Sequence, residues 1–300
     1  MLSVTILGNN SAIPAHGRNP TAQVLQTQDE CYLIDCGEGT QQQLAKYKIK
    51  RGRINHIFIS HLHGDHYFGL IGLLTSMGLL GRSTDLHLHA PAPLEEIIRL
   101  QLSAADTILP YKLFFHPLGE ECQIADDKKI TVECIKVNHR IPCWGFVFRE
   151  KKNPRRIDPE LVKAYEIPSA YYEALQKGAD YTTKKGTIIS NIDLTTANSP
   201  AKAYAYCADT LYDESIVDKV KQVDLLYHEA TYLKAFATQA AERYHSTTEE
   251  AASIAKQAKA KKLIIGHFSS KYEVLDEFLV ESCAIFPNTE LALEGTCYII

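Results

Sequence analysis

The feature that most constrains this chain is a cluster of metal-binding side chains directly after a β-forming run. INHIFIS predicts a buried strand, and HLHGDH follows it without a break. His61 and His63 are two residues apart on chain that is still extended, so both side chains can reach one metal ion. Asp65 and His66 come one turn later, at a helix start, and can hold a second ion. Such a concentration of charge and imidazole is electrostatically unfavourable without a cation, so the stretch predicts a two-metal site.

Three further candidate ligands each follow another predicted strand. His139 comes after ITVECIKVN, Asp209 after AYAYCA and His267 after KLIIG. Open α/β sheets collect their ligands at the carboxyl ends of strands. With the HLHGDH side chains these residues make seven ligands, enough for two zinc ions if the Asp209 carboxylate bridges them and water fills the remaining positions.

Two segments carry candidate acid–base chemistry, YHEAT at 227–231 and YHST at 244–247. Each places a histidine at the boundary of a predicted element. Two divalent ions form the clamp used in phosphoester hydrolysis, in which water is activated and the leaving alkoxide needs a proton donor. We predict that His245, backed by Glu229, is this donor; a capping or hydrogen-bonded structural role is the alternative for either histidine.

The order of predicted elements indicates a mixed α/β (α+β) fold. Short strands are expected at 3–8, 22–27, 31–35, 54–60, 85–90, 201–208, 222–228 and 262–267. Helices are expected at 64–80, 94–103, 214–220 and 248–260, the last opened by Thr247 and Glu250 at capping-box spacing. Two similar βα halves facing each other would make one domain over residues 1–300. Residues 150–200 are charged and weakly periodic, so we expect a flexible arm inserted there.

The charge distribution limits the partners that this chain can bind. A net charge of -4 excludes a globally basic nucleic-acid binder, so RNA would have to meet a local patch. KYKIKRGR at 46–53 and REKKNPRR at 149–156 are such patches, although a basic run is also typical of a solvated face. The amino terminus lacks a secretory signal, and no window approaches about 18 consecutive apolar residues. We therefore expect a cytoplasmic protein that does not enter the membrane.

Other residues with potential chemistry are predicted to serve structure. The eight cysteines form no C-x-x-C pair and lie mostly in apolar runs, which indicates reduced core residues. His87 and His89 alternate on one face of a predicted strand and follow no metal motif. We expect structural roles for them and for His16, His56 and His116.

These motifs together resemble the ribonuclease Z (tRNA 3′-endonuclease) family of the metallo-β-lactamase superfamily. The resemblance rests on HLHGDH, on HEAT and HST, on the insertion after FVFRE and on the opening LGNNSAIP with Arg18 and Asn19. It implies an αββα four-layer sandwich with a projecting arm that binds tRNA, a homodimer and two zinc ions per subunit. The implied reaction removes 3′ trailers from precursor tRNA, leaving a 3′-hydroxyl on the tRNA and a 5′-phosphate on the trailer.

The resemblance also assigns roles to individual residues. One zinc ion would be held by His61, His63 and His139, the other by Asp65, His66 and His267, with Asp209 as the bridge. Asp65 would accept a proton, and His245, oriented by Glu229, would donate one to the leaving 3′-oxygen. The implied substrate contacts are His228, Thr231, Ser246, Arg18, Asn19, Lys151, Lys152, Arg155 and Arg156.

The chain departs from the family pattern at two places, and other functions share parts of its motif. The arm reads EIPSA at 166–170 instead of a Gly-Pro turn, and the early loop reads PAHGRN at 14–19 without the usual lysine. The sequence therefore predicts neither the arm tip nor the response to a 3′ CCA end. A metallo-phosphodiesterase for small or cyclic nucleotides would share all seven ligands without needing the arm. A thioester or lactam hydrolase fits the motif less well, and a non-catalytic RNA-binding relative should lack ligands.

Overall fold

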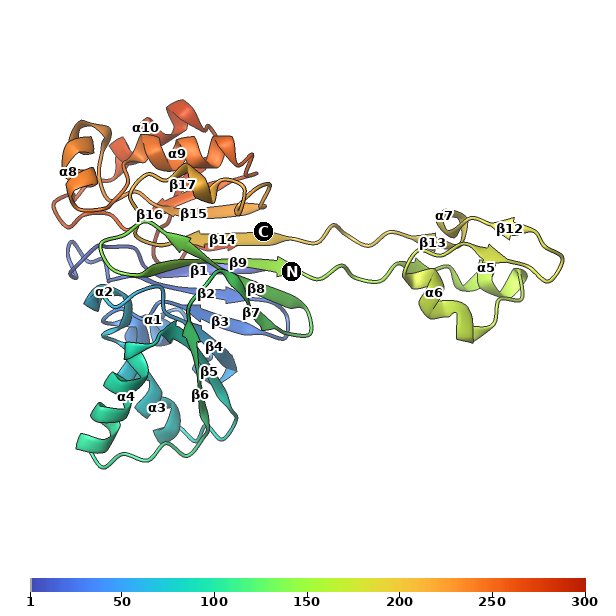
Figure 1. Ribbon diagram of the computed structural model, residues 1–300, viewed down its shortest axis with the longest axis horizontal. Helices are drawn as coiled ribbons and strands as arrows, with labels where there is room; N and C mark the ends of the chain where they lie inside the picture. Colours follow the sequence, from blue (N-terminus) through green and yellow to red (C-terminus); the bar gives the residue numbers. More distant parts are fainter. Residues whose placement is uncertain (1) are drawn as a thin grey trace. The chain divides into compact units, whose positions relative to one another are not determined.

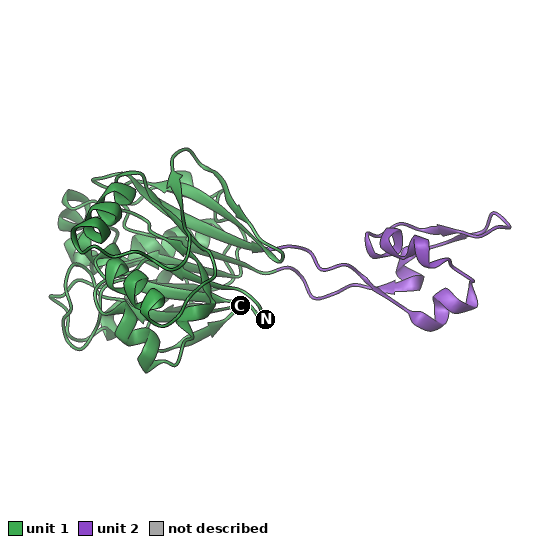
Figure 2. Cartoon of the chain, turned by 90° about the horizontal axis from the view of Figure 1, so that it is seen from below, with its two compact units in different colours: residues 1–149, 202–300 green, residues 150–201 purple. Residues whose placement is uncertain are grey.

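The computed structural model describes residues 2–300, which form two compact units (Figure 2). One unit holds the chain up to Arg149 together with Lys202–Ile300, and the other is Glu150–Ala201. Within the described residues no helix combines the length and the apolar character that crossing a membrane requires.

The larger unit is built on two seven-stranded sheets that lie face to face (Figure 1). The strands of the first sheet, in spatial order, are β18 (Cys297–Ile299), β1 (Ser3–Gly8), β2 (Ala22–Gln26), β3 (Cys31–Ile34), β4 (Ile54–Phe58), β5 (Leu86–Pro91) and β6 (Leu113–Leu118). Those of the second are β17 (Thr289–Leu291), β16 (Leu263–Gly266), β15 (Leu225–Glu229), β14 (Ala203–Cys207), β9 (Cys143–Glu150), β8 (Ile130–Val137) and β7 (Cys122–Asp126). Every expected strand is therefore present, with ends that differ by at most three residues.

Helices cover the outer face of each sheet, so the unit has four layers (Figure 1). The first sheet carries α1 (Thr40–Lys46), α2 (Gly64–Tyr67), α3 (Leu70–Leu79) and α4 (Pro93–Ala104). The second carries α8 (Ala237–Glu242), α9 (Thr248–Gln257) and α10 (Asp276–Ile285). The predicted αββα arrangement is confirmed.

The core between the sheets is aromatic. Tyr32 and Phe58 of the first sheet face Phe146 and Phe148 of the second, with ring centroids 5.7 Å apart for Tyr32–Phe148 and 5.3 Å for Phe58–Phe146. All four side chains are fully buried. Aromatic side chains bury much apolar area and prefer such tilted contacts, which hold the sheets at a fixed spacing.

Three local expectations need correction. The helix expected at 64–80 is broken between α2 and α3 at Gly69, where an added Cβ would lie 2.2 Å from the Gly37 carbonyl oxygen. The helix expected at 214–220 is only the 3₁₀ turn η3 (Glu214–Ile216). Two of the expected core cysteines, Cys122 and Cys297, are exposed at sheet edges.

The capping box that opens α9 is confirmed. The Thr247 hydroxyl accepts from the Glu250 backbone N–H, and the Glu250 carboxylate accepts from the Thr247 backbone N–H at 2.7 Å. The loop before α9 carries His245, so this reciprocal cap fixes where the loop ends and the helix begins.

The smaller unit has its own core, in which Leu175 and Leu194 are fully buried with Val162, Ile167 and Tyr181. Its elements are β10 (Arg156–Ile157), α5 (Pro159–Ala164), α6 (Tyr172–Gln176), β11 (Tyr181–Thr182), β12 (Ile188–Ile189), α7 (Asn191–Leu194) and β13 (Thr195–Thr196), with the 3₁₀ turn η2 (Ser169–Tyr171). Tyr171 and Tyr181 pack edge to face at 5.1 Å, so these tyrosines pack the unit against itself.

Candidate metal centre

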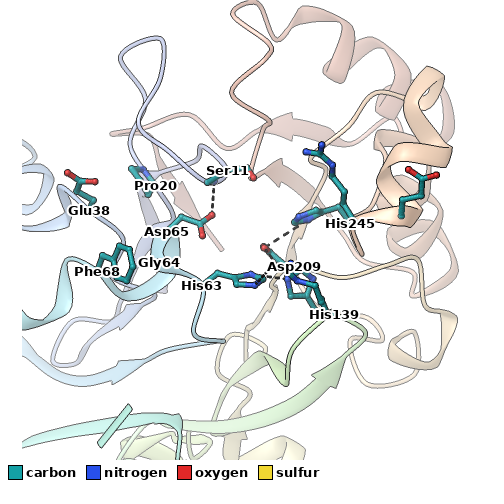
Figure 3. A pocket seen from close by; sticks show the side chains of 14 residues that line it. Ser11, Pro20, Glu38, His63, Gly64, Asp65, Phe68, His139, Asp209 and His245 are labelled. Atoms are coloured by element: carbon teal, nitrogen blue, oxygen red, sulfur yellow. Dashed lines mark hydrogen bonds and ion pairs between the residues drawn. The ribbon is translucent and has the colours of Figure 1, made fainter. Parts of the chain in front are cut away.

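The seven expected ligands meet at one edge of the two sheets (Figure 3). They come from the loop between β4 and α2, from α2 itself, and from the segments after β8, β14 and β16. Their nitrogen and oxygen atoms fall into two groups, and a third group, made of Asp209, His245 and His267, shares one residue with each. The first group is His61, His63, His139 and Asp209, and the second is Asp65, His66 and His267.

The Asp209 carboxylate faces both groups. Its Oδ2 lies 3.6 Å from His61 Nε2, and its Oδ1 lies 3.4 Å from His66 Nε2 and 3.3 Å from His267 Nε2. Zinc binds imidazole nitrogen and carboxylate oxygen at roughly 2.0–2.2 Å, so two ligands of one ion lie within about 4 Å of each other. These separations would allow the atoms to share a divalent metal ion.

The chemistry of the donor set also fits divalent metal. His66 Nε2 and Asp209 Oδ1 are buried and have no hydrogen-bond partner among the described residues. A buried polar atom without a partner is costly, and a cation between these atoms would satisfy both. Imidazole and carboxylate are ligands that zinc accepts.

Electrostatics favour the metal-binding forms of His61, His63 and Asp209. Burial, with the neighbouring His66, keeps the pKa of His61 well below its ordinary value, and burial with His139 lowers the pKa of His63 to about 4. Burial alone would raise the pKa of Asp209, but His267 and His66 hold it well below the usual range. Neutral imidazoles and an ionised carboxylate are the forms that coordinate a cation. For His66, burial alone would lower the pKa, but Asp209 and Asp65 raise it well above its ordinary value, so this imidazole loses a proton when it binds a cation.

Asp35 holds the ligand His66 in place through a hydrogen bond, and the sequence analysis did not single it out. At the end of β3 its fully buried carboxylate accepts from His66 Nδ1 at 2.8 Å, from the Ser60 backbone N–H at 2.7 Å and from the Tyr206 hydroxyl at 2.6 Å. A carboxylate on the far nitrogen fixes a ligating histidine's tautomer and ring orientation. The available signal was CYLID, an acidic residue at the end of a predicted strand.

His245 lies beside the ligands and is held by Glu229. Its Nδ1 is 2.9 Å from Glu229 Oε1 and 4.0 Å from Asp209 Oδ2. Although burial alone would lower it, the charge and hydrogen bond of Glu229 raise the pKa of His245 to about 9. This shift favours the protonated imidazole, the form that a proton donor needs.

The expected substrate contacts in HEAT and HST lie beneath the surface. His228, Thr231 and Ser246 are at most 1% exposed. The Thr231 hydroxyl is 2.9 Å from His267 Nδ1, and the Ser246 hydroxyl donates to the Thr210 carbonyl at 2.7 Å. None of the three side chains lines the cavity over the ligands, and Thr231 contacts the ligand His267.

The early loop, which contains Arg18 and Asn19, is also hydrogen-bonded to neighbouring segments. Arg18 Nε donates to Asn10 Oδ1 at 2.9 Å and Arg18 Nη1 to the Glu273 carbonyl at 3.1 Å, while Asn19 bonds the Glu294 carboxylate. The same loop reaches the centre, because the Ala12 backbone N–H donates to Asp65 Oδ2 at 2.7 Å. In the smaller unit Lys151, Lys152 and Arg156 are exposed, whereas Arg155 is half-buried and bonds Thr195.

A cavity of about 540 Å³ opens over the ligands. The expected residues His63, Asp65, His139, Asp209 and His245 line its floor (Figure 3). Its walls add side chains that the sequence did not single out, Phe68, Arg140, Arg243, Glu38 and Glu242. The cavity presents both ligand groups and His245 to one bound group, the arrangement needed for metal-assisted hydrolysis.

The chain is similar to several known proteins. A ribonuclease Z of Bacteroides thetaiotaomicron is 46% identical over 297 residues, 98% of this chain and 94% of that protein. The solved structure of human tRNase Z, short form, is 28% identical with a TM-score of 0.73 over 99% of both chains. The metallo-beta-lactamase fold protein YhfI from Bacillus subtilis, 19% identical, shares the fold with a TM-score of 0.70 over the whole of both chains. The family model described as anti-Pycsar protein Apyc1 matches residues 2–152.

Proposed function

The chain belongs to the ribonuclease Z family, and from this membership we propose that it is a metal-dependent endoribonuclease that processes the 3′ ends of precursor tRNA. Its residues 2–152 also belong to the family described as anti-Pycsar protein Apyc1. That match includes HLHGDH and His139 but ends before Asp209, HEAT, HST and His267. The relatives named ribonuclease Z match across all of these residues, so they carry the functional assignment.

The observation that carries the proposal is the placement of Asp209 and His245 in one cavity. Asp209 faces both ligand groups, and His245, paired with Glu229, lies 4.0 Å from Asp209 Oδ2. A phosphodiester bound over Asp209 would have its leaving oxygen within reach of a positioned acid. Hydrolysis of an internal RNA phosphodiester needs this combination of charge stabilisation and proton donation.

We propose two zinc ions per subunit. His61, His63 and His139 would hold one, Asp65, His66 and His267 the other, with Asp209 shared. When bound, two such ions supply Lewis-acid stabilisation and water activation at neutral pH. The donor set fits this number because Asp209 offers one oxygen to each group.

The remaining steps fall to the protein's own side chains. Asp65 accepts the proton of the attacking water, while His245 Nε2, on the ring edge away from Glu229, donates a proton to the leaving ribose 3′-oxygen. The tRNA then ends in a 3′-hydroxyl and the trailer begins with a 5′-phosphate. The proposal includes a cytoplasmic homodimer whose smaller unit, with Lys151, Lys152, Arg155 and Arg156, binds the tRNA body by phosphate contacts.

The test is cleavage of a precursor tRNA that carries a 3′ trailer, with both product ends mapped. The parent protein, the Asp65→Ala variant and the Asp218→Ala variant are compared, because Asp218 is a surface carboxylate 87% exposed in an unrelated ion pair. We expect the parent and Asp218→Ala to cut at the discriminator or directly after an encoded CCA, and Asp65→Ala to be inactive.

Two results would contradict the proposal. If Asp65→Ala retained both metal ions and full activity, Asp65 would not be the proton acceptor. If the parent left precursor tRNA intact but hydrolysed a small phosphodiester, the chain would be a small-molecule or cyclic-nucleotide phosphodiesterase, the function that shares the seven ligands without needing the smaller unit.

A further inference from the structure

An exposed aromatic ring stands at the wall of the catalytic cavity. Phe68, at the end of α2, is 63% exposed and lines the cavity beside Gly64 and Asp65 (Figure 3). Because the ring is 63% exposed, most of its surface is available to a group bound in the cavity. The reaction assigned above uses no aromatic side chain, so Phe68 is unaccounted for.

The ring is held in place by its neighbours. A Cβ added to Gly64 would lie 2.2 Å from Phe68 Cε2, so the ring covers the Gly64 backbone at van der Waals distance. Tyr67 contacts it edge on, with ring centroids 5.0 Å apart. A ring fixed in this way loses little conformational freedom when a partner stacks on its open face.

The two sides of the cavity differ in chemistry. Arg140, whose Nη2 lies 2.9 Å from His63 Nε2, and Arg243, which donates to the Tyr232 hydroxyl at 3.3 Å, are the arginines of the lining. Figure 3 shows Phe68 and Glu38 on one side of Asp65 and His63, and His245 on the other. Glu38 lies on the Phe68 side and Glu242 precedes Arg243 in the chain, so acidic side chains are not confined to one side. What distinguishes the Phe68 side is an exposed phenyl ring.

We propose that Phe68 is the stacking platform for the base on the 3′ side of the cut, the first nucleotide of the trailer. This inference rests on the proposed function. His245 protonates the 3′-oxygen of the upstream nucleotide, so that ribose lies on the His245 side and the RNA continues through the scissile phosphate toward Phe68. Every base has a π face, so the platform tolerates any trailer sequence while fixing the position of the chain.

The test pairs a substrate change with a protein change. Two precursor tRNAs are compared, one intact and one with an abasic ribose as the first trailer nucleotide. The protein variants are Phe68→Ala, Phe68→Tyr, which keeps a stacking ring, and Phe114→Ala, which removes a 40% exposed phenylalanine of β6 outside the cavity lining.

We expect the parent, Phe68→Tyr and Phe114→Ala to prefer the intact substrate in kcat/KM by about tenfold, the size of one base–aromatic stack. Phe68→Ala should cleave both substrates at the same rate. The inference is overturned if Phe68→Ala keeps the full preference or if the parent shows none. If instead the proposed function is wrong, the parent and all three variants will leave the intact precursor uncleaved, so the two cases can be told apart.

Discussion

At the scale of single residues, Glu229 holds His245, the proposed proton donor, in position. Its fully buried carboxylate accepts from the Thr210 backbone N–H at 3.0 Å, the Thr231 backbone N–H at 2.9 Å and the Ser246 backbone N–H at 3.1 Å, besides His245. An ionised carboxylate only accepts hydrogen bonds, so it satisfies all these donors and keeps the negative charge beside His245. Glu229 therefore acts through His245 as a positioning residue.

Glu229→Gln should lower kcat for precursor tRNA by roughly 10²-fold or more, because the amide removes the charge that keeps His245 protonated and turns a donor toward backbone N–H groups. The expected change is in kcat, with bound metal unchanged. The control is Glu249→Gln on the outer face of α9, which only loses a surface ion pair with Lys234. An unchanged kcat in Glu229→Gln would show that His245 works without this carboxylate.

Asp35→Asn should weaken zinc binding by about 10–100-fold, because the amide cannot accept from His66 Nδ1, Ser60 and Tyr206 at once and so fails to fix the His66 ring. Competition for zinc with a chromogenic chelator measures this directly. Asp218→Asn, at the exposed surface, should bind zinc as the parent does. Equal affinity in Asp35→Asn would mean that backbone packing alone orients His66.

At the scale of elements, the strands β4, β5 and β6 carry a second group of histidines away from the metal centre. Strand register places His56 opposite His87, and His89 opposite His116. His56 Nδ1 lies 3.1 Å from His89 Nε2, and His87 Nδ1 lies 2.9 Å from His116 Nε2. Asp127 closes the array, 3.3 Å from His56 Nε2. The structural role expected for these histidines is thus a hydrogen-bonded, stacked array on the sheet.

This array should make the protein sensitive to acid. Burial, followed by the neighbouring His116, lowers the pKa of His89 to about 2, whereas an unfolded histidine takes up a proton near pH 6.5. The stability that His89 contributes is therefore complete above pH 6.5 and is lost as pH falls below it. Between pH 7 and pH 5 the parent should lose roughly 2 kcal/mol more unfolding free energy than His89→Phe, which keeps a stacking ring but cannot titrate.

Urea unfolding at several pH values, with chelator present in both samples, gives this difference. The comparison concerns how unfolding free energy changes with pH, so a constant loss in His89→Phe from the missing hydrogen bond to His56 does not affect it. Parallel pH profiles for parent and variant would show that His89 is protonated equally in the folded and unfolded chains.

At the scale of the whole molecule, the smaller unit is inserted at a point where two strands already meet. Arg149 of β9 pairs with Ala203 of β14 in antiparallel register, so the residues on either side of the insertion are neighbours. The larger unit also has its own cores, between the sheets and beneath the helices of the first sheet. Neither core includes a residue of Glu150–Ala201.

Replacing residues 150–202 by Asn-Gly should therefore leave a folded larger unit, because a two-residue turn closes an antiparallel pair. We expect the shortened chain to keep its zinc content and its cooperative melting. Its kcat/KM for precursor tRNA should fall by about 10²-fold or more and become less dependent on salt, since the phosphate contacts of the smaller unit are gone. Full activity toward precursor tRNA would show that the larger unit alone binds the substrate.

Residue patterns alone predicted the main strands, the capping box and which residues gather at the metal centre, whereas the four-layer sandwich was expected from the family resemblance. The strands follow from the periodicity of hydrophobic residues, and the ligand positions follow from polar residues at strand ends. Both patterns can be read from consecutive residues. Three features became visible only in the folded protein: Asp35 bonds His66, Thr231 and Ser246 are buried, and Phe68 lines the cavity. The physical reason is that strand register and close approach of distant segments set these contacts, and no local pattern in one chain encodes them.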